Sequence, residues 1–365
     1  MSTIKFNTIL ACTLLCGVFT TEPSLDAAYI VQKGRIIDSC NAATTSARGH
    51  FERASKAYEK CHWHEAAKNF NIIVVNFPGS VYAQEAYYFL GISNYFLEEY
   101  DHANEALSEY LKVQNNPRYF QSAVEFKFAI AENFDAGAKR RPFGSKQLPK
   151  WLPGQSSALK IYDEVIAAVP CHEIAARALI AKGCLLWRWH DYHPAVEAFQ
   201  MVIRRFPKYE RTPECYLYIG KIYLEQSQFE FQNSDILAFS QINLRKFERD
   251  FPREERLCEA EMDVLAIKEI YACGLFETGS FYERICKKRA AVIYYNDAIR
   301  QFPNTCIAEK CRERMRLLNP AYIENLPHVE TLEEDGLLNE PVAVIIENDD
   351  EIEGAAIDFS EIESE

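Results

Sequence analysis

Two histidine pairs are the residues of this sequence whose types and spacing could hold a metal ion. His62 and His64 are separated by one residue, and His190 and His193 by two. Imidazole nitrogens are frequent metal ligands. However, Trp63 lies inside the first pair, and the second pair falls at an expected turn between two helices. We therefore interpret these histidines as polar turn or cap residues and predict no metal site.

Other catalytic chemistry has little support in the sequence. No Ser-His-Asp set, phosphate-binding loop or pair of catalytic carboxylates stands out. The 12 cysteines include no Cys-x-x-Cys motif, so zinc binding and thioredoxin-type chemistry lack support as well. The sequence predicts a protein that is not an enzyme and carries no cofactor.

The cysteines leave their redox state open. Two of the 12 lie near the amino terminus, and the other ten are scattered along the chain. Several stand at apolar helix positions, where a small buried thiol is one interpretation: Cys184, Cys215, Cys273 and Cys286. A structural disulfide is the alternative, because cysteines that pair would fit an oxidising compartment.

The elements that would position any site are helices arranged in a repeat. In residues 195–207 a small residue, an aromatic and an aliphatic stand 12, eight and five positions before Pro207, and Phe206 precedes it directly. These intervals place the marked side chains on one helical stripe, and the proline ends the helix. Five copies of this frame end at Pro78, Pro170, Pro207, Pro252 and Pro303, the fourth being the weakest.

The composition fits such an array better than one compact domain. A chain of 365 residues with 48% hydrophobic residues can bury a sizeable core, but a single domain of this length would be unusual. In an array each repeat packs only on its neighbours. We predict an all-α helical repeat solenoid of about five to six helix pairs plus a capping helix over 306–318.

The expected helices follow the prolines. In pairs, they cover 50–60 and 63–77, 82–98 and 102–114, a third pair from 119 that is interrupted by 135–155, then 173–189 and 192–206, 213–226 and 235–251, and 255–274 and 281–302. Three glycines stand 12 residues before an alanine of the next helix: Gly91 before Ala103, Gly183 before Ala195 and Gly279 before Ala291. We expect each glycine to face its alanine, which would let the two helices approach closely.

The interrupting segment 135–155 contains several glycines and prolines, so it is expected to be a long loop inside one helix pair. Its basic run, 139–141, has two interpretations: a solvated loop, or a docking point for an acidic partner surface. Trp151 lies near Pro149 and Pro153 and is expected to tuck against the body of the protein.

The net charge of −13 belongs to the carboxyl-terminal end. From Leu317 onward there are 15 acidic residues and no Lys or Arg, which leaves 38 acidic and 40 basic residues elsewhere. A nearly neutral body argues against nucleic acid as the main partner. We predict that 49–318 form the helical array and that 319–365 are an acidic disordered tail.

The amino-terminal end resembles a secretory signal. Lys5 is followed by a mostly apolar run over 6–20, which is too short for a comfortable membrane span. Residues 1–27 are predicted to be a signal sequence and 28–48 a linker, with a buried amino-terminal helix as the alternative. A lipoprotein form of the signal would use Cys16 or Cys12 as the lipidation site.

The proline frame, with a Leu-Gly pair 12 residues before the small position, resembles the tetratricopeptide repeat over roughly 50–318. Two further segments, Phe77-Pro-Gly-Ser-Val-Tyr-Ala-Gln-Glu-Ala and Tyr294-Tyr-Asn-Asp-Ala-Ile-Arg-Gln-Phe-Pro303, are similar to the BamD family. The secretory amino end and the basic insertion also resemble that family of outer-membrane β-barrel assembly lipoproteins. This resemblance implies an envelope location and protein partners.

Tetratricopeptide arrays bind extended peptides or helices in a groove lined by the first helix of each pair. The glycine positions point six side chains toward such a groove: Tyr88, Tyr95, Arg177, Trp187, Arg188 and Lys221. We predict a scaffold at the periplasmic face of the bacterial outer membrane that assists assembly or insertion of β-barrel proteins. A cytosolic tetratricopeptide chaperone adaptor or secretion cochaperone is the alternative, and it requires that 1–20 be retained.

Overall fold

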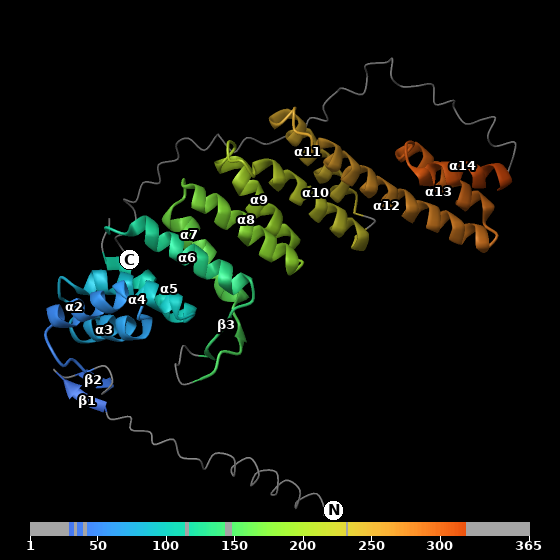
Figure 1. Cartoon of the computed structure of the whole chain (residues 1–365). Helices are drawn as coiled ribbons and strands as arrows, with labels where there is room; N and C mark the ends of the chain where they lie inside the picture. Colours follow the sequence, from blue (N-terminus) through green and yellow to red (C-terminus); the bar gives the residue numbers. More distant parts are fainter. Residues whose placement is uncertain are drawn as a thin grey trace, which may run out of the picture. The chain divides into compact units, whose positions relative to one another are not determined.

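The computed structural model confirms the expected fold class, an all-α and tetratricopeptide-like helical array (Figure 1). The structure describes residues 29–32, 35–38, 42–113, 117–142, 148–230 and 233–318. The predicted signal sequence, Cys12, Cys16 and the predicted acidic tail therefore lie outside the described residues.

Within the described ranges, ten helices form five successive pairs. The pairs are α2 (Ala47–Glu59) with α3 (Trp63–Asn76), α4 (Ala83–Phe96) with α5 (Tyr100–Val113), α6 (Phe120–Asp135) with α7 (Gln155–Ala168), α8 (Glu173–Arg188) with α9 (Tyr192–Arg205), and α10 (Thr212–Phe229) with α11 (Ser234–Asp250). Three more helices follow them: α12 (Leu257–Arg284), α13 (Lys288–Gln301) and α14 (Cys306–Leu318). Below, α2, α4, α6, α8 and α10 are called first helices, and their partners second helices.

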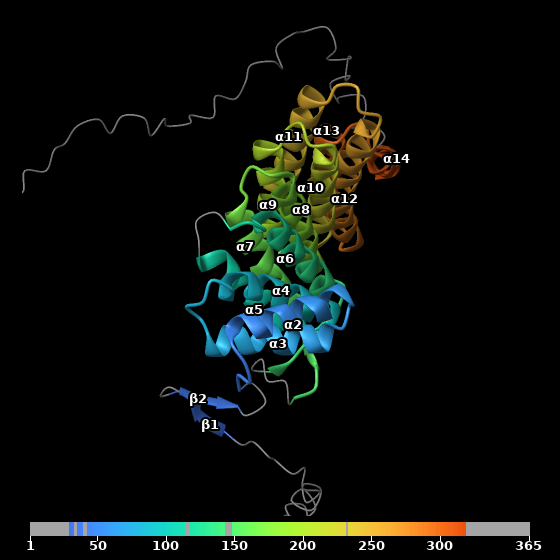
Figure 2. The same cartoon turned by 60° about the vertical axis from the view of Figure 1, so that its left-hand side comes forward.

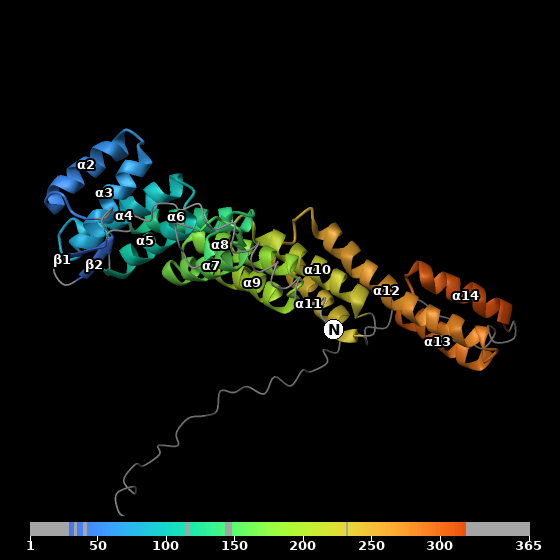
Figure 3. The same ribbon diagram turned by 90° about the horizontal axis from the view of Figure 1, so that it is seen from below.

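The chain divides into two compact units, residues 1–274 and residues 275–365. In the first unit, the helices pack in succession, each against the next one along the chain, from α2 against α3 to α10 against α11. First helices also contact one another directly, α4 with α6 and α6 with α8 (Figure 2). In the second unit, α13 packs against α14 (Figure 3).

The proline frame explains where four of the second helices and α13 end. α3, α7, α9, α11 and α13 each stop two residues before their proline. The residue between still donates its N–H to the helix, as Phe206 does to the carbonyl of Val202 at 2.8 Å. Its φ of −127° has left the helical region, because a proline disfavours helical geometry at the preceding residue.

The frame's aromatic position supplies much of the core. Phe70, Tyr162, Phe199 and Tyr295 are all fully buried. The equivalent residue of the weakest copy, Leu244, is only partly buried. The hydrophobic stripe inferred from the prolines is therefore the face on which each second helix packs.

The turns after α2, α4, α8 and α12 share one backbone conformation. Cys61, Glu98, His190 and Cys286 each follow a helix with φ between 58° and 60°. In the first of these turns, the N–H of Cys61 bonds to the carbonyl of Tyr58 at 2.9 Å, as in a Schellman-type helix end. Glycine is the residue that adopts this left-handed geometry without a steric penalty, yet none of the four is glycine.

The glycine-to-alanine contact expected from the sequence is wrong in its nearest partner, although a Cβ on Gly91 would also lie 3.4 Å from the carbonyl oxygen of Ala103. A Cβ on Gly91 would lie 2.6 Å from Leu107 Cγ, and one on Gly183 would lie 2.7 Å from Phe199 Cζ. Gly279 likewise faces Tyr295. The glycine accommodates the large side chain four residues after the alanine, because residues four apart lie on the same helical face.

The expected break near the carboxyl end is also wrong. The sequence predicted that one helix ends at 274 and the next begins at 281, but α12 runs unbroken from 257 to 284. No proline interrupts the segment, and Gly274 and Gly279 each cost a helix only about 1 kcal/mol. α12 thus begins in the first unit and ends in the second.

The segment predicted to be a linker contains a short antiparallel hairpin, β1 (Tyr29–Gln32) and β2 (Arg35–Asp38). A second pair of short strands, β3 (Lys139–Arg140) and β4 (Leu152–Pro153), closes the base of the predicted long loop. Among the described residues, no helix is both long and apolar enough to cross a bilayer.

The glycine contact predicts opposite effects for two alanine substitutions. Gly183→Ala should lower the free energy of unfolding by about 1–3 kcal/mol, because the new methyl group overlaps the Phe199 ring. Gly220→Ala should raise it by about 0.5–1 kcal/mol, because its Cβ would meet only Asp263 Oδ2 at 3.5 Å and alanine favours helix. Urea denaturation of both variants tests this, and equal effects would contradict it.

The left-handed turn residues predict a stabilising substitution. Cys61→Gly should raise the free energy of unfolding by about 0.5–1 kcal/mol, since it removes the steric cost of positive φ at an exposed position. Cys61→Ala keeps that cost and serves as the control. Thermal denaturation of both variants measures the difference, and an alanine variant as stable as the glycine variant would refute the explanation.

Candidate functional site

The six side chains predicted to line a groove lie on α4, α8 and α10. Five of them contact the first helix of a neighbouring pair, and Lys221 contacts α12. The hydroxyl of Tyr88 donates to Ser122 Oγ at 2.9 Å, and its ring stacks on Tyr119 with centroids 4.5 Å apart. Burial raises the pKa of the Tyr88 phenol, and the side chain is only 6% exposed. Tyr95 packs edge-on against Phe126 of α6, with ring centroids 5.3 Å apart. These two tyrosines join the second helix pair to the third.

Two arginines of α8 reach back to α6. The guanidinium of Arg177 lies 4.5 Å from the centroid of the Phe128 ring and forms an ion pair with Glu132 at 3.7 Å. Arg188 forms an ion pair with Asp135 at the end of the same helix. A cation over an aromatic face and a carboxylate partner together hold Arg177 in place.

The last two predicted residues connect toward α10 and α12. Trp187 Nε1 donates to Glu225 Oε2 at 2.7 Å. Lys221 Nζ lies 2.5 Å from Glu259 Oε1, and this hydrogen bond raises the pKa of the lysine. Contacts therefore run between successive first helices from α4 to α10, and then from α10 to α12, within the first unit.

This surface of contacts between first helices, which we call the first-helix face, accounts for all six residues. Tyr88 is a buried packing residue, whereas Arg177, Arg188 and Lys221 are about half exposed. Every one of these cations already has a carboxylate neighbour, so a bound partner would share or displace that ion pair. Their role in binding a partner stays a prediction.

His190, the first histidine of the second pair, is a turn residue whose side chain contacts Glu225. His190 has the left-handed backbone described above, and its Nδ1 lies 3.1 Å from Glu225 Oε1. Tyr192 donates its hydroxyl to the same Glu225 oxygen at 3.1 Å. Within the described residues, no group of three or more His, Cys, Asp or Glu side chains is placed to hold a metal ion.

Several cysteines are free thiols in the described structure. Cys61, Cys171, Cys258 and Cys286 are exposed, Cys184 is half-buried and Cys215 is buried. Burial raises the pKa of Cys215 to about 12, so this thiol stays protonated and unreactive at neutral pH. The prediction of a buried thiol is confirmed for Cys215 and is wrong for Cys286, which lies exposed in the turn after α12.

The basic insertion is fixed by internal ion pairs. Arg141 donates through Nη2 and Nε to the two oxygens of Glu99, at 2.8 and 3.1 Å. Lys150 Nζ lies 3.4 Å from Glu99 and donates to the carbonyl of Glu98 at 2.7 Å. These hydrogen bonds, that from Arg141 above all, lower the pKa of Glu99 from its usual 4.5 to about 2. Two cations of the basic run are thus paired with carboxylates, Arg140 with Asp101 and Arg141 with Glu99, whereas Lys139 is exposed and forms no ion pair with a described residue.

The expectation that Trp151 tucks against the body is wrong. Its side chain is 61% exposed. The strand pairing of Arg140 with Leu152 and the ion pairs at Glu99 hold this part of the loop against α4 and α5 without burying the indole.

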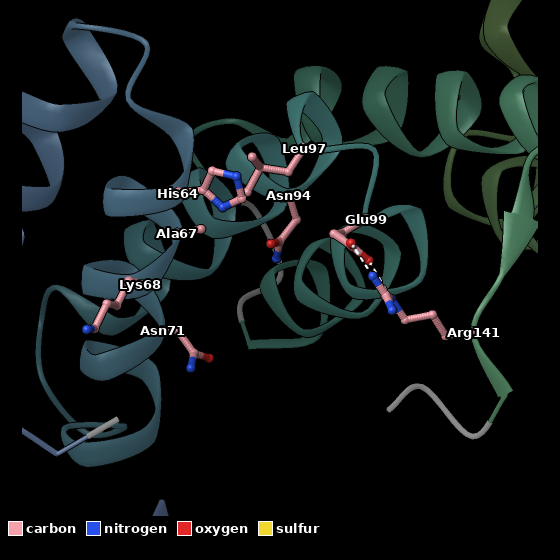
Figure 4. Close-up of a pocket in the computed structure, with 8 residues that line it drawn as sticks. All are labelled: His64, Ala67, Lys68, Asn71, Asn94, Leu97, Glu99 and Arg141. Atoms are coloured by element: carbon pink, nitrogen blue, oxygen red, sulfur yellow. Dashed lines mark hydrogen bonds and ion pairs between the residues drawn. The ribbon is translucent and has the colours of Figure 1, made fainter. Parts of the chain in front are cut away.

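A cavity of about 240 Å³ lies where the insertion meets the second helix pair. Figure 4 shows side chains of α3 on one side, the Glu99–Arg141 pair on the other, and Asn94 between them. The lining residues are His64, Ala67, Lys68, Asn71, Asn94, Leu97, Glu99 and Arg141. Sequence reasoning missed this cavity, because the arginine that forms one wall comes from a loop whose fold it did not predict.

Comparison with known proteins finds solved structures that this chain resembles. No family model matches the sequence, and no curated protein matches it. Among solved structures, a tetratricopeptide repeat protein of Bacteroides fragilis shares 12% identity, with a TM-score of 0.37 over 76% of this chain and 100% of that one. MamA of Desulfovibrio magneticus RS-1 shares 16% identity, with a TM-score of 0.31 over 58% and 99%. Such low scores and identities carry no argument about function.

The Glu99 ion pairs predict a pH dependence. Because the folded-state pKa lies below the usual value, the stabilisation is full above pH 4.5 and is lost as the pH falls toward about 2. Glu99→Gln should therefore lower the free energy of unfolding at neutral pH by about 2 kcal/mol and lessen its fall in this acid range. The neighbouring Glu98→Gln, whose exposed side chain takes no part, is the control. Identical acid profiles for Glu99→Gln and the unaltered protein would refute the prediction.

Proposed function

We propose that this protein is a non-enzymatic protein-binding scaffold of the bacterial envelope that assists assembly or insertion of outer-membrane β-barrel proteins. The observation that supports a scaffold is the first-helix face. It carries partly buried aromatic side chains such as Tyr95 and Trp187, and about half-exposed cations such as Arg177 and Arg188. Aromatic bodies supply contact area, and arginine can hold carboxylates or peptide carbonyls of a partner.

The envelope location rests on the sequence. A positive charge followed by an apolar run over 6–20 is typical of a secretory signal, and Cys16 or Cys12 would carry the lipid. The sequence segments that resemble the BamD family point to outer-membrane assembly components or extended peptides as partners.

One structural observation favours a second candidate, a cytosolic chaperone adaptor or secretion cochaperone. Cys61, Cys171 and Cys258 are exposed free thiols. Free exposed thiols are typical of a reducing compartment. The two candidates share the scaffold chemistry and differ in whether the first residues are removed.

The mass and membrane partitioning of the mature protein from a Gram-negative host distinguish the candidates. The envelope scaffold predicts loss of the first 15 or 11 residues, with a lipid adduct on Cys16 or Cys12 and recovery with outer membranes. Cys16→Ala and Cys12→Ala variants identify the modified residue. An unprocessed soluble protein beginning at Met1 would contradict the envelope function and favour the cytosolic adaptor.

A further inference from the structure

The cavity between α3 and the insertion holds a buried polar group without a partner. Asn94 is 4% exposed, and its side chain makes no hydrogen bond with the described residues although it lines the cavity. Only its backbone carbonyl is used, by the N–H of Glu99 at 2.9 Å. The amide group offers two N–H donors and a carbonyl acceptor at the wall of the cavity. The side chain is therefore available to a ligand that enters the cavity.

The charges around Asn94 favour an anion. Lys68 lines the cavity, is exposed and forms no ion pair with any described residue. The carboxylate of Glu99 is matched by two cations, Arg141 and Lys150, so the balance at this wall is positive as well. His64 lies in the first turn of α3, where no side chain caps the helix, and the positive end of the helix dipole adds to the same field.

The size of the cavity and the apolar residues in its wall fit a short part of a peptide. Ala67 and Leu97 supply apolar surface beside the polar groups. A cavity of about 240 Å³ can hold an acidic side chain with its adjoining backbone amide, but not a folded domain. Asparagine can bond to the N–H and the C=O of one peptide group, and lysine can pair with a carboxylate.

We propose that this cavity binds an acidic residue of an extended peptide, with Lys68 on its carboxylate and Asn94 on its backbone amide. The cavity is formed by α3, the end of α4 and the insertion, and not by the first-helix face. It is therefore a second site, and its failure would leave the proposed scaffold function standing.

The chain itself supplies a suitable probe. A labelled peptide spanning 345–354 carries five acidic residues and no basic one, and the matched control peptide replaces each Glu by Gln and each Asp by Asn. Binding to the full-length protein is measured by fluorescence anisotropy at physiological salt. We expect the acidic peptide to bind and the neutral peptide to bind at least about tenfold more weakly.

Two variants test the named contacts. Lys68→Gln should weaken binding of the acidic peptide about tenfold, whereas Lys56→Gln, an exposed lysine of α2 that does not line the cavity, should leave it unchanged. Asn94→Asp keeps the side-chain volume but repels the ligand, and should abolish binding while circular dichroism reports an intact fold. Equal weakening by Lys56→Gln and Lys68→Gln, or no weakening by Lys68→Gln, would overturn the proposal.

The source of the natural peptide is resolved by a third full-length variant, in which the five acidic residues within 345–354 are neutralised. If the chain's own tail occupies the cavity, this variant binds the added peptide more tightly than the unaltered protein does. If the ligand belongs to a partner, the two proteins bind it equally. Both outcomes require the Lys68 effect, and its absence refutes either source.

Discussion

The close contact between a glycine of one helix and a large side chain of the next is the interaction on which the array depends. A helix pair cannot bury its apolar stripe alone, so it must pack tightly on its partner and on its neighbours. Gly183 lets the ring of Phe199 reach the backbone of α8, and Gly91 does the same for Leu107 on α4. Gly220 lacks this close contact, since a Cβ placed on it would meet only Asp263 Oδ2 of α12, at 3.5 Å.

The sequence predicted the second helices better than the first. Four of the five second helices, α3, α7, α9 and α11, end before a proline, which disfavours helical geometry at the preceding residue. The first helices and α12 lack such a signal. The break expected near 274 was therefore wrong, and α12 continues to 284. Helix packing also decided which residue each glycine contacts, and a spacing of 12 residues alone did not contain that information.

The candidate site was predictable in position but not in its contacts. Glycine spacing placed the six groove residues on first helices, which is where they lie. Their partners come from other repeats, as Glu225 does for Trp187, and no local pattern specifies a contact over 38 residues. The cavity was unpredictable for the same reason, since Arg141 reaches it through a loop fixed by ion pairs at Glu99.

These contacts give the first-helix face two tasks. Its aromatic and charged groups hold neighbouring repeats together, and their exposed portions are the surface that we propose binds a partner. A partner that takes over one of these ion pairs would therefore act on the coupling between two repeats. The insertion adds a separate element, because the ion pairs that fix it also build one wall of the cavity.

The central claim, that side chains of the first-helix face couple adjacent repeats, is tested most directly by a double-mutant cycle on Trp187 and Glu225. Free energies of unfolding would be measured for Trp187→Phe, Glu225→Gln and the double variant. A shared contact predicts that the double variant loses less stability than the sum of the single losses, by about 0.5–3 kcal/mol. Additivity within about 0.3–0.5 kcal/mol would contradict the claim, because it would mean that the indole and the carboxylate stabilise their helices independently.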